Sequence, residues 1–336
     1  MERRDQIAGI LLGTALGDAV GLPFEGLSPQ RVARRLRRRA LAPSVWRGWS
    51  FVSDDTEHTA LVARALVTSR GDPRALARHL GRGLRRWFWS LPPGIGWATL
   101  RSAIKLTLGW SPERSGVRSA GNGASMRAAL LGACATDDAH LRRLIAASTR
   151  TTHRDPRAED AARAVARAAR AARHGAPSAA VIDRLAAASD TEPLRRSLDA
   201  VADCLDRGAH PAAHVGWEHG VSGYCVDTVP AALWAWGAHR GDPAAAIEAA
   251  VRLGGDTDSV AAIAGALAGA EDGAAALPGA WLQQLRDWPL TRAHLDALAG
   301  ALCGGPLPRD RTLLALPRNL VAGVALGVHA LRRLAW

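Results

Sequence analysis

Two short acidic motifs, about two hundred residues apart, carry the side chains best suited to chemistry in this chain. The first is Ser-Asp-Asp-Thr at residues 53–56, and the second is Gly-Gly-Asp-Thr-Asp-Ser at residues 254–259. Each precedes an apolar stretch, so its carboxylates and hydroxyls fall in the first turn of a predicted helix. Hard oxygen ligands of this kind suit Mg²⁺ or Mn²⁺ and not Zn²⁺. Either motif alone is also an ordinary helix N-cap, but the two together favour a shared metal centre.

The elements that must position these motifs are helices. Ala-rich, helix-favouring stretches run along nearly the whole chain, and the alternating pattern that indicates strands is weak. The predicted helices lie at residues 5–20, 28–41, 54–69, 73–89, 97–108, 124–135, 138–149, 157–174, 178–188, 193–206, 226–238, 243–252, 258–271, 279–286, 291–302 and 318–334. Since 336 residues can bury a large core and no linker is evident, we predict one compact all-α domain over residues 1–310.

Residues 311–336 are predicted to form an additional C-terminal helix that packs on this domain. A dimer contact and a membrane-surface helix are the alternatives for this segment. Apolar residues nearly encircle the helix, whereas an interfacial helix is apolar on one face only. This pattern favours packing.

The motifs resemble those of the ADP-ribosylglycohydrolase family. The matching segments are residues 9–26 (GILLGTALGDAVGLPFEG), 53–56 (SDDT), 119–127 (SAGNGASMR), 152–156 (THRDP), 223–228 (GYCVDT) and 254–259 (GGDTDS). They follow the family's order over roughly residues 7–270. The combination is specific, although no single motif would be. The resemblance implies an all-α hydrolase that cleaves ADP-ribose from an acceptor at a binuclear site holding two Mg²⁺ or Mn²⁺ ions.

By this resemblance, Ser53, Asp54 and Asp55 form one group of metal ligands. Asp256, Asp258 and Ser259 form the other group. Thr56 and Thr257 are alternative hydroxyl ligands. Glu25 matches a catalytic glutamate in part of the family and, like Asp55, is expected to take part in catalysis. A carboxylate beside the metals can take a proton from water or give one to the leaving group. The alternative for Glu25 is a surface loop residue, and Asp18 is expected to be a structural acid that caps a nearby loop.

The resemblance also suggests which residues bind the substrate. Backbone N–H groups in the small-residue turn at 121–127 suit a diphosphate. The predicted contacts in this turn are Gly121, Asn122, Gly123, Ala124, Ser125 and Met126. Arg127 is expected to make an internal ion pair instead. His153 lines the cleft or serves as a structural histidine, and Tyr224 stacks on adenine or belongs to the core.

The net charge of +12 raises the question of nucleic-acid binding. Lys105 is the only lysine among the 43 basic residues, so the excess of arginine reflects GC-rich codon bias. The densest run, Arg31–Arg39, fits a helix with a solvated basic face. Nucleic acid is therefore an unlikely partner, and the arginines would instead attract an anionic dinucleotide. The expected partner is an ADP-ribosylated protein or a small-molecule ADP-ribose conjugate.

The N-terminal segment predicts a buried helix. Gly9, Gly13 and Gly17 recur every four residues and form a face that another backbone can approach closely. The segment has the outline of a signal peptide, but Asp18 and Glu25 follow it at once. The apolar run is too short and too interrupted to span a bilayer, so we expect no transmembrane segment. The four cysteines form no C-x-x-C pair, which fits a reducing cytoplasm.

The acceptor of ADP-ribose stays open at this point. A protein side chain, with arginine as one candidate, is the first expectation. O-linked and nucleic-acid-linked ADP-ribose are alternatives, as is a non-catalytic ADP-ribose-binding or crystallin-like relative. Relatives active on ADP-ribosyl-arginine commonly carry an acid in a P-x-D-I-G-type loop, and here Gly94 stands where that acid would be. A guanidinium leaving group would lose an ion pair there, so we expect weak activity on arginine-linked substrates.

Overall fold

Helices account for nearly all the regular structure in residues 2–43, 50–172 and 178–334, the part of the chain that the computed structural model describes. Side chains are described up to residue 324. Within these ranges the chain forms eighteen α-helices and four short 3-10 turns, and the only β-type contacts are isolated bridges between loops. The predicted all-α class is therefore confirmed.

The α-helices are α1 (Arg3–Gly21), α2 (Pro29–Leu36), α3 (Asp54–Ser69), α4 (Pro73–Trp89), α5 (Trp97–Thr107), α6 (Pro112–Ser115), α7 (Ala129–Cys134), α8 (Asp138–Arg150), α9 (Pro156–Ala172), α10 (Ser178–Ala187), α11 (Glu192–Asp206), α12 (Ala212–Val215), α13 (Cys225–Ala238), α14 (Pro243–Arg252), α15 (Thr257–Asp272), α16 (Gly279–Gln284), α17 (Arg292–Leu302) and α18 (Ala315–Leu334). The 3-10 turns are η1 (Leu22–Phe24), η2 (Asn122–Ala124), η3 (Ala274–Ala276) and η4 (Thr312–Leu314).

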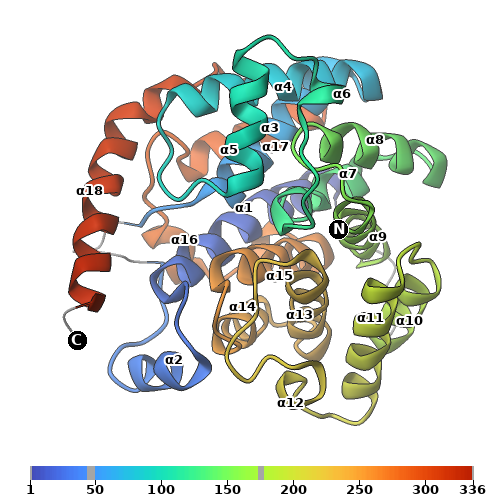
Figure 1. Cartoon of the computed structure of the whole chain (residues 1–336), viewed down its shortest axis with the longest axis vertical. Helices are drawn as coiled ribbons and strands as arrows, with labels where there is room; N and C mark the ends of the chain where they lie inside the picture. Colours follow the sequence, from blue (N-terminus) through green and yellow to red (C-terminus); the bar gives the residue numbers. More distant parts are fainter. Residues whose placement is uncertain (1, 44–49, 173–177, 335–336) are drawn as a thin grey trace.

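The pair α1 and α15 forms the centre of the fold (Figure 1). Glycines of α1 face the backbone of α15 along the whole contact. A Cβ atom would lie 2.1 Å from the carbonyl oxygen of Gly265 if placed on Gly13, and 1.9 Å from that of Ala261 if placed on Gly17. Only glycine permits such close approach. The predicted glycine face therefore docks α1 on the helix that begins with the second acidic motif.

The remaining helices surround this pair. Helices α3, α14 and α17 pack on α1, while α9, α13 and α14 pack on α15. Helix α4 lies outside α3 and contacts α5 and α8, and α10 and α11 form a further pair next to α9 and α13 (Figure 1). The starts of α3 and α15, which carry the two acidic motifs, consequently meet beside α1.

Most predicted helices are present, with three differences. The helix predicted at 124–135 was wrong over its first turns: η2 occupies 122–124 and α7 starts only at Ala129, because the amides of Ser125 and Met126 bond back to the carbonyl of Asn122. The helix predicted at 28–41 ends at Leu36, where a run of arginines begins. The short helices α6 and α12 were not predicted. Residues 173 and 174 of the predicted helix 157–174 lie outside the described residues.

The N-terminal apolar helix is longer than expected. The stretch Arg3–Phe24 has 22 residues and contains an 18-residue window with a mean hydropathy of 1.6, enough by length and composition to cross a membrane, so the prediction that it is too short was wrong. That window is, however, 94% buried inside the protein. Its apolar character is that of a core helix, since α15, α17 and α3 cover it.

All four cysteines are free thiols.

Candidate active site

One cavity of about 410 Å³ lies where the acidic motifs meet. Its walls come from the loop 22–25, the starts of α3 and α15, the loop before α5, the turn η2 and helix α18. Of the residues predicted from the sequence, the following line it: Glu25, Ser53, Asp54, Gly121, Asn122, Gly123, Met126, His153, Asp256, Asp258 and Ser259. Side chains from both acidic motifs thus share a single pocket.

Three buried carboxylates form a cluster beside this pocket. Oxygen atoms of Asp18, Asp55 and Asp258 all lie within 4.8 Å of one another. Hydroxyl groups from both motifs converge on Asp55: Oδ2 accepts from Ser53 Oγ at 3.0 Å and from Ser259 Oγ at 3.2 Å. The first motif also folds as the helix cap that its composition predicts, because Ser53 Oγ accepts the Asp55 amide at 3.2 Å.

Two carboxylate oxygens of the cluster have no protein partner among the described residues. Asp55 Oδ1 and Asp258 Oδ1 are buried and accept no hydrogen bond from the described residues. Burial raises the pKa values of both carboxyl groups well above the ordinary range, and the neighbouring negative charges add to the effect. Buried carboxylate oxygens without partners are costly. A hard divalent cation would satisfy them, so the residues present fit such an ion.

Asp18 holds the first acidic motif in place through hydrogen bonds. Its carboxylate accepts the Ser53 amide at 2.9 Å and the Thr56 amide at 3.1 Å, and it binds the Thr56 hydroxyl at 2.5 Å. It therefore caps the start of α3, as expected of a structural acid. Its closeness to Asp55 and Asp258 was not predicted, because it depends on how α1 packs between α3 and α15.

Asp54 and Asp256 reach the pocket wall from the two motifs. Burial, together with neighbouring carboxylates, raises the pKa of Asp54 to about 8. Burial also raises the pKa of Asp256, whereas hydrogen bonds to its carboxylate lower it. One of these bonds comes from Asn122 Nδ2, 2.5 Å from Asp256 Oδ2. Asn122 therefore links the small-residue turn to the second acidic motif.

The two glycines before Asp256 allow its position. Gly254 and Gly255 have φ angles of 69° and 77°, in the left-handed region that favours glycine. The Gly255 amide donates to the Leu27 carbonyl and the Asp256 amide to the Val221 carbonyl, each at 2.8 Å. A Cβ on Gly255 would lie 2.0 Å from the Val221 oxygen. The Gly-Gly pair thus packs between the loops that contain Leu27 and Val221, which fixes the direction of the Asp256 carboxylate.

The small-residue turn is already partly engaged. The Asn122 amide donates to the Gly223 carbonyl, and the amides of Ser125 and Met126 donate to Asn122. Of the predicted diphosphate contacts, Gly121, Asn122, Gly123 and Met126 line the pocket. Ala124 and Ser125 are buried behind the wall that Gly121, Gly123 and Met126 form.

His153 packs against this turn from behind. A Cβ on Gly123 would lie 3.0 Å from the imidazole Cε1, so the absence of a side chain there makes room for the ring. Burial, with the nearby Arg127 charge, lowers the pKa of His153 to about 3, which keeps the ring neutral.

Arg127 is buried as expected, but its partners are His58 and hydroxyl and carbonyl groups of α8 and the turn after it, not a carboxylate.

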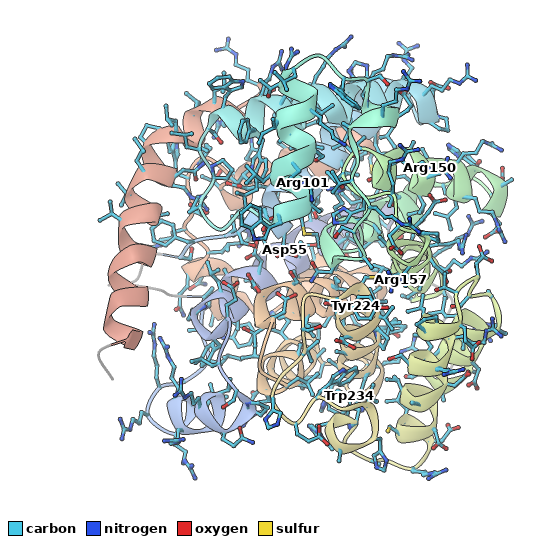
Figure 2. The ribbon with its side chains drawn as sticks, in the orientation of Figure 1. Asp55, Arg101, Arg150, Arg157, Tyr224 and Trp234 are labelled. Carbon is cyan, nitrogen blue, oxygen red and sulfur yellow. The ribbon has the colours of Figure 1, made fainter. Side chains whose placement is uncertain are left out.

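Tyr224 lies next to the pocket rather than in its wall. Its backbone pairs with Gly121, and the guanidinium of Arg157 lies 5.4 Å from the centre of its ring. Arg157 also donates to the phenol oxygen at 3.1 Å. Figure 2 shows the two side chains together beside the start of α13. The ring is half-buried and packs against the hydrophobic core, and the sequence held no sign of its arginine partner.

Glu25 is exposed on the pocket rim after η1. Its charge contributes to the raised pKa of Asp258, which shows that the two carboxyl groups are close in space. The pocket residues that were not predicted include Glu57, one turn into α3, and Arg318 in α18. Glu57 directly follows the Ser-Asp-Asp-Thr motif in sequence, so its place in the pocket could have been predicted. Arg318 lies outside the matching motifs, so its place could not.

Comparisons with known proteins agree on one family. The sequence matches the ADP-ribosylglycohydrolase family over residues 1–311. An uncharacterized protein of Archaeoglobus fulgidus is 31% identical over 315 residues, covering 89% of this chain and 96% of that protein. The ADP-ribosyl-(dinitrogen reductase) glycohydrolase of Rhodospirillum rubrum is 27% identical over 292 residues, covering 84% and 90%. A solved structure, an ADP-ribosylglycohydrolase-related protein complex, has a TM-score of 0.68 at 30% identity and covers 90% of this chain and 98% of that one.

Proposed function

Because this chain belongs to the ADP-ribosylglycohydrolase family, a family of glycosidic-bond hydrolases, we propose that its pocket releases ADP-ribose from an acceptor with the help of two Mg²⁺ or Mn²⁺ ions. The observation that carries the metal requirement is the pair of buried oxygens, Asp55 Oδ1 and Asp258 Oδ1, that lack hydrogen bonds beside the pocket. Like charges held this close repel strongly, and a cation relieves the repulsion.

The residues that would hold the ions come from both motifs. Ser53, Asp54 and Asp55 contribute from the start of α3, and Asp256, Asp258 and Ser259 from the start of α15. When bound, the ions would act as Lewis acids that orient the ribose and stabilise charge as the glycosidic bond breaks. Asp18 and Asn122 position this set, since one caps the first motif and the other binds Asp256.

We assign the nucleotide part of the substrate to the side of the acidic cluster where the small-residue turn lies. The turn at Gly121 and Gly123, which lines the pocket, suits the diphosphate, and neutral His153 packs against it. The Tyr224–Arg157 pair lies beyond Gly121, where an aromatic face and a cation suit adenine and phosphate. This arrangement leaves the anomeric carbon of the terminal ribose next to the carboxylates.

Glu25 is the residue that would move a proton. It lies on the rim near Asp258, where solvent reaches it. Glycosidic bonds of this type break through an oxocarbenium-like transition state. A carboxyl group on the rim can deprotonate the attacking water or protonate the leaving group.

The acceptor is proposed to be carried by a protein or a small molecule. The Rhodospirillum rubrum relative is named for an ADP-ribosylated protein, dinitrogen reductase, which supports a protein-linked substrate. The pocket opens to solvent next to the exposed side chain of Trp97, so a protein surface can approach it.

One experiment tests the proposal as a whole. Purified protein is incubated with arginine-linked, serine-linked and nucleic-acid-linked ADP-ribose, with and without Mg²⁺, and free ADP-ribose is measured. At least one substrate should be cleaved with Mg²⁺, and Asp258→Asn should abolish cleavage while the exposed control Asp199→Asn retains it. Binding of ADP-ribose without cleavage of any substrate would instead favour a non-catalytic ADP-ribose sensor.

A further inference from the structure

Helix α18 forms part of the pocket although it lies outside the family match. The match ends at residue 311, and α18 begins at Ala315. Two of its side chains, Arg318 and Ala322, nevertheless line the cavity. Figure 1 shows the helix along one edge of the molecule, beside the loop that joins α4 to α5.

Arg318 fixes α18 to the body of the protein. Its side chain is only 8% exposed and donates to Glu57 at 3.0 Å and to Asp287 at 3.1 Å. It also donates to the carbonyl of Val52 and lies over the ring of Phe51. Two carboxylates thus balance the single positive charge, so Arg318 presents no net positive charge to the pocket.

Asn319 gives the helix a second attachment. It is 1% exposed, and its side-chain amide donates to the Ser90 carbonyl at 2.8 Å and contacts the Ser90 hydroxyl at 3.2 Å. Ser90 is the residue at which α4 ends. The loop that follows, which includes Gly94, lines the same pocket. Two attachments therefore fix the position of α18: Arg318 binds Glu57 and Asp287, and Asn319 binds Ser90 beside the loop that lines the pocket.

The described side-chain contacts of α18, up to residue 324, lie at one end of the pocket. The residues that hold the nucleotide turn, such as Gly223, His153 and Asp256, share no described contact with α18. The first acidic motif adjoins the α18 contacts through Val52 and Glu57, and the second adjoins the turn through the bond from Asn122 to Asp256. If ADP-ribose occupies the turn side, the acceptor must leave along the side that α18 closes.

We propose that α18 is the wall of the acceptor end of the pocket and that Ala322 sets the size of the acceptor that fits. This inference rests on the proposed function. Phe51, Pro93 and Gly94 line the same cavity as Ala322, and none of the three carries a charge. An acceptor that is compact and uncharged suits such a wall. A bulky acceptor would meet the helix, and none of these three residues offers an acid to a cationic acceptor.

The test is a substitution that fills this end of the pocket. Ala322 is 6% exposed, so Ala322→Leu places three additional carbons against the cavity, and Val321→Leu, at a position 63% exposed on the same helix, is the matched control. Affinities are measured by calorimetry for ADP-ribose and for serine-linked and arginine-linked ADP-ribosyl peptides. A hydrolysis-deficient Asp258→Asn background keeps the peptides intact, and thermal unfolding verifies that each variant folds.

Ala322→Leu should weaken binding of both peptides by about tenfold or more, as one or more methylene groups in a pocket typically do. Its affinity for free ADP-ribose should remain within about twofold of the parent, and Val321→Leu should match the parent for every ligand. Equal weakening of ADP-ribose and peptides would place α18 at the nucleotide end and overturn the inference. Unchanged peptide binding would overturn it as well. Absence of hydrolysis in the wild-type protein would refute the proposed function alone, because these binding ratios do not depend on cleavage.

Discussion

Ser259 Oγ donates a hydrogen bond to Asp55 Oδ2 at 3.2 Å, although 204 residues separate the two in sequence. Ser53 Oγ donates to the same oxygen at 3.0 Å. Asp55 therefore joins the two acidic motifs through one oxygen, while Oδ1 accepts no hydrogen bond from the described residues. The hydroxyl groups hold one oxygen of the carboxylate in place, and the second oxygen would be available to a cation.

Glu25 provides the first prediction. If it transfers a proton in the transition state, Glu25→Gln should lower kcat by roughly 10²–10⁴-fold. ADP-ribose affinity should stay within about twofold, since the amide keeps the shape of the side chain. Steady-state kinetics and calorimetry measure the two quantities, and the exposed Glu218→Gln serves as the control. Equal losses in binding and rate would make Glu25 a ligand or structural residue instead.

Gly94 provides the second prediction. It has a φ of 76°, and a Cβ there would contact nothing within 4 Å, so the loop has room for an acid that the sequence does not supply. Arginine-linked ADP-ribose should therefore have a lower kcat/KM than serine-linked ADP-ribose. Gly94→Asp should raise the ratio of arginine-linked to serine-linked kcat/KM by about tenfold through an ion pair with the guanidinium. A wild-type preference for arginine of tenfold or more, on the order of 1.4 kcal/mol, would show that Gly94 is incidental.

The glycines of α1 that face the backbone of α15 provide the third prediction. Alanine in a helix interior gains up to about 1 kcal/mol over glycine. At Gly17, however, the new Cβ would lie 1.9 Å from the Ala261 carbonyl oxygen, so α1 and α15 would have to separate. Gly17→Ala should lower the free energy of unfolding by about 3 kcal/mol or more. Gly279→Ala, where a Cβ meets nothing, is the control. Chemical denaturation measures both, and similar stabilities for the two variants would contradict the packing.

Buried histidine provides the fourth prediction. Burial, with the charges of Arg311 and Arg64, lowers the pKa of His294 to about 4, whereas an unfolded histidine has a pKa near 6.5. A depressed pKa means that the unfolded state binds the proton first, so the contribution to stability is complete above pH 6.5 and is lost as the pH falls toward 4. The loss has a maximal slope of about 1.4 kcal/mol per pH unit.

The measurement for this prediction is the difference between variants, in which the other titrating groups cancel. His294→Gln should reduce the dependence of the free energy of unfolding on pH between about 6.5 and 4. The exposed His214→Gln should leave it as in the wild type. Parallel pH curves for His294→Gln and the wild type would show that His294 does not carry this linkage.

Local patterns in the sequence were enough to predict the helices and the meeting of the two motifs. The four-residue glycine spacing predicted a close helix contact, and the structure identifies α15 as the partner. The acidic motifs were recognised because their residues are contiguous. Glu57 and Asp18 were harder to assign, since what each contacts depends on neighbouring helices.

Three features could not be predicted because they arise from contacts between distant segments. Arg318 reaches Glu57 across 261 residues, and nothing in the composition of α18 indicates a pocket wall. Arg157 covers Tyr224 across 67 residues. The turn after Asn122 replaces a predicted helical turn because carbonyl and amide groups pair locally there, although Ala and Met favour a helix.

Removal of divalent cations tests the central claim most directly. The protein is treated with excess EDTA, assayed for release of ADP-ribose from a cleaved substrate, and assayed again after addition of Mg²⁺ or Mn²⁺. We predict that chelation lowers the rate by several orders of magnitude, that the added ion restores it, and that titration of the metal-free protein gives about two ions per chain. Asp55→Asn should remove at least one of these binding events. Full activity in excess EDTA would contradict the account.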